Sequence, residues 1–174
     1  MLVTDLVQIR RVGEKNRKEN LRFRKHIKSH TFVERQFRRA AEEIQDQIDC
    51  KTCAECCRVT EVQVAERDVE KLSRYLGISE NEFFEKHAEE DADGQVILKR
   101  VRGADGKPGA CEFLSGNECT VYDARPGNCE RFPHLLRGAG SLESRMWQFV
   151  DRATYCPIVY NWMEKVKGLT NFKK

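Results

Sequence analysis

The chain has 174 residues, of which 34% are charged and 40% are hydrophobic, and its formal net charge is +3. A mean hydropathy of −0.67, and the lack of any uncharged apolar run near the roughly 18 residues that a membrane span needs, exclude a transmembrane protein. The first residues place apolar side chains before basic ones and lack a small-residue cleavage site, so the sequence predicts a cytoplasmic location and no secretory signal.

Residues 1–48 are predicted to form a basic helical arm, because lysine and arginine outnumber aspartate and glutamate there. A helical pattern covers 20–48, and Thr31 followed by Glu34 matches a capping box. An apolar stripe follows at spacings of three and four residues, formed by Val33, Phe37, Ala40, Ala41, Ile44 and Ile48. The basic surface indicates docking onto the acidic segment 61–93 or an acidic protein partner. Nucleic acid is disfavoured, because no aromatic residues are interleaved with the basic ones.

Two helices and a strand are predicted after the first group of cysteines. Alternating apolar and polar residues indicate a short strand over 59–64. The segment 66–76 has helical periodicity and ends at Gly77, a residue typical of helix termination. Ser79, followed three residues later by glutamate, matches a second capping box and opens another helix.

Phe83 and Phe84 of this second helix are expected to face the core. A strand is predicted over 95–101, followed by a turn-rich stretch at 103–109 with three glycines and a proline.

The C-terminal part contains two further patterned segments. Residues 145–151 alternate as a strand would, with Trp147 and Phe149 on one side. Residues 157–167 predict a helix, because Pro157 suits a first helical turn and apolar residues recur on one face.

Eight cysteines carry the strongest chemical signal in the chain, and in a reducing compartment they remain thiols unless a metal holds them. They are Cys50, Cys53, Cys56, Cys57, Cys111, Cys119, Cys129 and Cys156. Two residues between cysteines allow a tight turn that brings both sulfurs to one ion, which is a half-site of zinc and iron-sulfur proteins. Adjacent side chains in extended backbone point apart, so Cys56 and Cys57 are expected to take different roles. All eight are candidate metal ligands, enough for two four-sulfur sites or for one cluster and four packed thiols.

The cysteine spacings occur together with a second signature. The motifs are Cys50-x2-Cys53-x2-Cys56-Cys57, Cys111-Glu-Phe-Leu and Cys119-Thr-Val-Tyr122-Asp-Ala-Arg125-Pro-x2-Cys129-x-Arg131-Phe-Pro. Over residues 50–134 the chain therefore resembles the CxxCxxCC cysteine-cluster family, also called the YkgJ-like zinc- or iron-chelating domain. It departs from that family at Ala54, where glycine is common, and at Glu130, where arginine is common. The resemblance implies a metal centre of zinc or iron and extends to part of the bacterial flagellin lysine N-methylases.

Three residues of the second signature are candidate cofactor-binding residues: Tyr122, Arg125 and Arg131. Thiolate-bound centres carry negative charge, and neighbouring donors that hydrogen-bond sulfur or neutralise that charge tune the centre. For Arg125 the alternative is an ion pair with Asp123, and for Tyr122 it is packing of the ring in the core.

We therefore predict an α+β fold: a small cysteine-rich, metal-centred domain over 49–174 with an N-terminal helical arm over 1–48. The predicted function is metal binding through clustered cysteines, in a structural or electron-transfer role. The cofactor is an iron-sulfur cluster or zinc, and the C-x2-C-x2-C run favours the cluster. Two alternatives stay open: a protein-modifying enzyme of the flagellin lysine N-methylase type, and a metal chaperone or thiol sensor with Cys57 as its reactive thiol.

Overall fold

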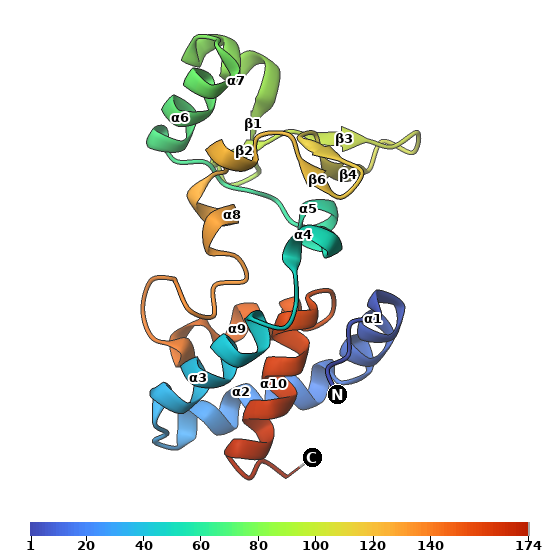
Figure 1. Ribbon diagram of the computed structural model, residues 1–174, viewed down its shortest axis with the longest axis vertical. Helices are drawn as coiled ribbons and strands as arrows, with labels where there is room; N and C mark the ends of the chain where they lie inside the picture. The colour runs from blue at the N-terminus through green and yellow to red at the C-terminus, as the bar shows by residue number, and fades with distance from the viewer. Residues whose placement is uncertain (174) are drawn as a thin grey trace. The chain divides into compact units, whose positions relative to one another are not determined.

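The computed structural model describes residues 1–173, and the chain divides into two compact units (Figure 1). The helical unit comprises Met1–Asp49 and Pro133–Lys174, and the cysteine unit comprises Cys50–Phe132. Helices and short antiparallel strands together make the fold α+β, as predicted, and the N-terminal region is helical. The division into an arm and a domain at residue 49 stays a prediction.

The helical unit packs its N-terminal helices against its C-terminal ones. Its helices are α1 (Leu6–Lys15), α2 (Arg17–Ser29), α3 (Glu34–Gln45), α9 (Leu142–Arg152) and α10 (Pro157–Leu169). Helix α3 packs on α10, and α2 packs on α9 (Figure 1). The Trp162 ring meets Phe149 edge to face at 5.1 Å between centroids, and its indole N–H donates to the Phe37 carbonyl at 2.9 Å. The predicted α3 stripe is buried at this contact, apart from its first member, Val33.

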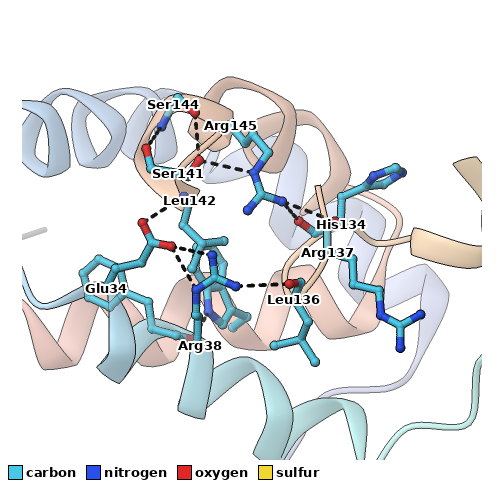
Figure 2. A network of polar contacts seen from close by, with 11 residues as sticks. Glu34, Arg38, His134, Leu136, Arg137, Ser141, Leu142, Ser144 and Arg145 are labelled. Atoms are coloured by element: carbon cyan, nitrogen blue, oxygen red, sulfur yellow. Dashed lines mark hydrogen bonds and ion pairs between the residues drawn. The ribbon is translucent and has the colours of Figure 1, made fainter. Parts of the chain in front are cut away.

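Helix α3 begins differently from the prediction. Its N-cap is Val33, whose side chain is 62% exposed, so the predicted capping box at Thr31 is wrong. The Glu34 carboxylate has other partners, as Figure 2 shows: it accepts hydrogen bonds from Arg38 at 2.7 Å and from the Leu142 backbone N–H at 3.2 Å. A carboxylate held by these donors joins α3 to the start of α9 and caps the latter helix.

The loop before α9 is held by arginine side chains (Figure 2). Arg145 is buried and donates to the carbonyls of His134, Arg137 and Ser141. Arg38 donates to the Leu136 carbonyl at 3.1 Å. Because these carbonyls have partners, this loop can follow an irregular path next to the helices without leaving them unsatisfied.

The predicted strand over 145–151 is wrong, because this segment belongs to helix α9. The residues it buries recur at helical spacing: Leu142, Arg145, Met146, Phe149 and Val150. Trp147 consequently points away from the Phe149 side and is 59% exposed. The helix predicted over 157–167 is confirmed as α10, with Pro157 in its first turn.

The cysteine unit combines short helices with two-stranded antiparallel sheets. Its helices are α4 (Cys50–Cys53), α5 (Glu55–Val59), α6 (Glu66–Leu76), α7 (Glu80–His87), the 3-10 helix η1 (Tyr122–Ala124) and α8 (Gly127–Arg131). Its strand pairs are β1 (Ala88–Glu90) with β2 (Val96–Leu98), β3 (Arg100–Arg102) with β4 (Pro108–Cys111), and β5 (Leu114–Ser115) with β6 (Glu118–Cys119). A core that includes Val69, Leu72, Phe83, Leu98 and Phe113 lies among them.

Helix boundaries in this unit follow the sequence signals closely. Helix α6 has the predicted bounds and ends at Gly77, whose φ of 70° is left-handed. The Ser79 hydroxyl accepts a hydrogen bond from the Glu82 N–H at 3.2 Å and caps α7. Phe83 of α7 is buried as expected, but Phe84 is 42% exposed, so the prediction for that residue is wrong. Phe84 lies about 100° farther around the helix axis than Phe83, which places it at the edge of the buried face.

Strand predictions in this unit were less accurate. The strand expected over 59–64 is wrong: Val59 ends helix α5, and Gln63 forms an isolated bridge with Ile97. The strand expected over 95–101 is split into β2 and β3. The turn expected over 103–109 is confirmed for 103–107, which connect β3 to β4, whereas Pro108 and Gly109 belong to β4.

Of the helices that the structure describes, none combines the length and apolar character required to cross a lipid bilayer.

Candidate metal centre

The CxxCxxCC motif folds as two short helices joined at one residue. Cys50 and Cys53 begin and end α4, and Cys56 and Cys57 lie in α5. Ala54 lies between the helices in a left-handed conformation, with φ 49° and ψ 15°. This reversal turns the chain between the first and second pairs of cysteines.

Cys56 and Cys57 were expected to point apart, and the structure contradicts this. Their Sγ atoms lie 4.0 Å apart. The expectation assumed extended backbone, whereas both residues are in the helix α5, where successive side chains are only about 100° apart around the axis.

The other cysteines come from separate segments. Cys111 ends strand β4, Cys119 ends β6, and Cys129 lies in helix α8. These three side chains are partly buried and pack against the core of the cysteine unit. Cys156 is buried in the helical unit, directly before α10, and therefore belongs to a different unit from the other seven cysteines.

Four thiols lie near enough to affect one another's ionisation, and we call them the four-thiol set: Cys57, Cys111, Cys119 and Cys129. Burial raises the pKa of Cys111 to about 11, with a contribution from the charges of Cys57 and Cys119. Burial raises the pKa of Cys129 to about 12, with contributions from the other three thiols. The pKa of Cys119 is also raised by burial and by Cys57. Every pair within the set therefore interacts.

Cys57 differs from the other members of the set. The hydrogen bond from the Cys56 thiol lowers the pKa of Cys57 to about 7, and the charges of Arg58 and Arg125 act in the same direction. Burial raises the pKa of Cys53, and the charge of the nearby Cys57 adds to that effect. Near neutral pH Cys57 is therefore partly ionised, whereas the other members of the set are thiols that are costly to ionise without a cation.

The donor chemistry suits a metal that prefers thiolate ligands. Partly buried cysteine sulfurs are soft donors, and a bound cation would offset the repulsion among their charges. Among residues 1–173, however, no three cysteine, histidine, aspartate or glutamate side chains lie close enough to hold one ion. One tetrahedral zinc, at about 2.3 Å from each sulfur, requires sulfurs about 3.8 Å apart. The donors therefore fit such a metal in kind, and one pair of sulfurs at about this separation in the described residues is Cys56 and Cys57, at 4.0 Å.

Tyr122 and Arg125 lie together beside this set. The Arg125 guanidinium is 3.5 Å from the centroid of the Tyr122 ring, and its Nε donates to the Tyr122 carbonyl at 2.9 Å. Its charge favours ionisation of Cys119 and Cys129 as well as Cys57. No ion pair between Arg125 and Asp123 occurs in the described part of the chain.

Arg131 is placed differently. Its side chain lies over Gly127, and its Nη2 is 3.5 Å from the Asn128 side-chain oxygen. Its assignment as a cofactor-binding residue stays a prediction.

Two residues that the sequence did not single out support the site. Arg58 donates to the Cys53 carbonyl at 2.9 Å, and it directly follows the cysteine motif, which is the signal that could have identified it. Asp68 accepts hydrogen bonds from the Gly127 N–H at 2.9 Å and from the Ala65 N–H at 3.0 Å. Its position near the start of α6 indicates helix capping, and no local pattern indicates its contact with α8.

Comparison with known proteins identifies one family. The model of a family described as "CxxCxxCC: Putative zinc- or iron-chelating domain" matches residues 49–157, which include all the cysteines. No curated protein and no solved structure matches the chain.

Proposed function

The chain belongs to the CxxCxxCC family of zinc- or iron-chelating domains, and from this premise we propose that its cysteine unit holds an iron-sulfur cluster through the four-thiol set. The observation that carries the proposal is the mutual interaction of Cys57, Cys111, Cys119 and Cys129, which come from four separate segments. Four cysteine thiolates are the usual ligands of such clusters. Bound there, a cluster would cross-link α5, β4, β6 and α8 and supply a one-electron couple.

The spacing of the thiols supports a cluster over a single zinc. Each iron of a four-iron cluster takes one protein sulfur, so the four sulfurs lie farther apart than the ligands of one ion. The thiols interact with one another, yet no three are within reach of one ion in the described residues. This combination favours the larger centre, in agreement with the C-x2-C-x2-C run.

The remaining cysteines have other roles in this proposal. Cys50, Cys53 and Cys56 share the motif with Cys57 and are candidate ligands of a second metal. Cys156 is a packed side chain of the helical unit, where it is 5% exposed.

The test is elemental analysis and an absorption spectrum of protein purified without oxygen. About four irons with matching sulfide and broad visible absorption are expected. Cys129→Ser should lose this absorption, and Cys156→Ser is the matched control that should keep it. A colourless protein with about one zinc would show that the centre holds zinc and not a cluster. Protein purified without any metal would refute metal binding by this chain.

A thiol sensor is the second candidate function, and the lowered pKa of Cys57 favours it. A thiolate at neutral pH reacts with oxidants and electrophiles faster than a thiol does. Nothing in the described residues adds support to the methyltransferase alternative.

We also propose that the exposed face of α2 contacts an acidic protein partner. This face presents Lys18, Arg22, Lys25 and Lys28, all exposed. The acidic residue of this helix, Glu19, is paired instead with Lys167 at 2.6 Å. Like charges three and four residues apart destabilise a helix, and an acidic partner would offset them.

A further inference from the structure

The Arg58 side chain joins the cysteine motif to the β5–β6 hairpin. Its Nη1 donates to the Cys53 carbonyl at 2.9 Å. Its Nη2 donates to the Gly116 carbonyl at 3.0 Å and to the Asn117 side-chain oxygen. One planar guanidinium therefore bridges two segments that are 58 residues apart in sequence.

The short loop of the β5–β6 hairpin has a conformation that allows this contact. Its two-residue loop is Gly116 and Asn117, and Gly116 has a left-handed φ of 62°, which a residue with a side chain rarely adopts. The Asn117 side chain also donates to the Thr52 carbonyl at 2.9 Å. The loop thus has two connections to the cysteine motif, and Cys119 follows it by two residues in β6.

The charge of Arg58 acts at the same place. Its hydrogen bonds go to neutral oxygens, and the nearest carboxylate contact is Glu55 at 4.0 Å. The Arg58 carbonyl accepts a hydrogen bond from Arg100 at 2.7 Å, which fixes the backbone as well. Positive charge held beside thiolates favours an anionic centre over the free thiols.

We propose that Arg58 is a positioning residue of the metal centre: it holds the CxxCxxCC motif against the hairpin that bears Cys119 and keeps a fixed positive charge beside the thiolates. This inference rests on the proposed function for the identity of the centre. Its geometric part, the connection between motif and hairpin, concerns the protein with or without metal.

The first arm of the test is metal release to a chelator, followed by absorbance, in the isolated holoprotein. Arg58→Met should release metal roughly 10- to 100-fold faster than the wild type, because loss of a residue that supports metal ligands usually lowers metal affinity by this range. Arg58→Lys keeps the charge and loses the fork, so its rate should be intermediate. Arg74→Met is the matched control, because Arg74 forms an exposed pair with Glu70 in the same unit.

A double-mutant cycle tests the connection itself. If Arg58 acts through the hairpin loop, the effects of Arg58→Met and Asn117→Ala on the release rate should be clearly less than additive, because both remove the Arg58–Asn117 contact and only the Asn117 hydrogen bond to Thr52 is lost separately. Fully additive effects of the two substitutions would overturn the connection. Release by Arg58→Met at the wild-type rate would overturn the role of Arg58.

The second arm uses metal-free protein and amide hydrogen exchange over residues 50–58 and 114–119. Arg58→Met should accelerate exchange in both segments, and Arg74→Met should leave it unchanged. Unchanged exchange in Arg58→Met overturns the inference even if the holoprotein contains metal. If the wild type takes up no metal, the proposed function fails, and accelerated exchange would still support the connection that Arg58 makes.

Discussion

Asp68 accepts a hydrogen bond of 2.9 Å from the backbone N–H of Gly127, and in this way helix α6 holds the first turn of helix α8. Asp68 is 7% exposed, and its second oxygen accepts a hydrogen bond from the Ala65 N–H. Nearby, Lys71 of α6 forms an ion pair of 2.8 Å with Glu130 of α8. Because α8 carries Cys129, these contacts fix one member of the four-thiol set from outside the set.

Replacing Asp68 should therefore destabilise the cysteine unit. Asp68→Ala leaves the buried Gly127 N–H without an acceptor, and we expect a loss of about 2 to 4 kcal/mol in the free energy of unfolding. Asp68→Asn keeps one acceptor oxygen and should cost about half as much. The measurement is urea unfolding of metal-free protein by circular dichroism, with Asp93→Ala, at an exposed turn, as control. Equal stability of Asp68→Ala and Asp93→Ala would show that this bond contributes nothing.

Local signals explain which parts of the fold could be predicted. Gly77 and Ser79 act within a few residues of themselves, so the end of α6 and the start of α7 follow from sequence. The capping box predicted at Thr31 is wrong because the Glu34 carboxylate accepts a hydrogen bond from Leu142, more than a hundred residues away. The strand predicted over 145–151 is wrong because a seven-residue segment can fit both a strand and a helix pattern. The packing of this segment on α2 favours the helix.

The left-handed conformation of Ala54 predicts a stabilising substitution. A residue with a β-carbon is strained at a φ of 49°, and glycine is not. Ala54→Gly should therefore raise the free energy of unfolding of metal-free protein by about 1 kcal/mol. Ala139→Gly, at an exposed loop position, is the control and should not stabilise the protein. A loss of stability in Ala54→Gly would mean that flexibility gained in the unfolded chain outweighs the relief of strain.

For the site, spacing identified the chemistry but not the grouping. The motif at 50–57 predicts thiolate ligands, yet it cannot show that Cys57 is the member placed near Cys111 and Cys129. That grouping depends on the left-handed turn at Ala54 and on the hydrogen bond that the Gly127 N–H of α8 donates to Asp68. The first is the backbone conformation of one residue and the second is a single long-range contact, and neither leaves a periodic pattern in the sequence.

Cys57 should be the first thiol to react in metal-free protein. With a pKa of about 7, its thiolate fraction rises with pH and is half-maximal near neutrality, so its alkylation rate should level off above about pH 8. Cys111 and Cys129, with pKa values of about 11 and 12, should still be accelerating there. Iodoacetamide labelling followed by peptide mass spectrometry measures each rate. A Cys57 rate that tracks that of Cys111 across this range would contradict the assignment.

Metal binding should be strongly pH-dependent, because protons compete with the metal for these sulfurs. At pH 8 Cys57 is already ionised, whereas Cys111, Cys119 and Cys129 have raised pKa values and must each lose a proton. Binding should therefore release about three protons, and affinity should fall about a thousandfold per unit decrease in pH. Zinc titrations of metal-free protein at several pH values, in weakly buffered solution, measure both quantities. Release of fewer than about two protons would show that fewer thiols of the set bind the metal.

The basic face of α2 should be suboptimal for the stability of the helix that carries it. Lys25 lies three residues from both Arg22 and Lys28, so Lys25→Glu replaces two repulsions by two attractions. We expect stability to rise by about 0.5 kcal/mol at low salt and the gain to shrink at high salt. Both tryptophans lie in the helical unit, so fluorescence-monitored unfolding reports on the relevant part. Lys107→Glu makes the same charge change in a turn of the cysteine unit and should give no gain. If Lys25→Glu is destabilising, the positive charges are already compensated within the chain, and the argument that an acidic partner offsets them loses its basis.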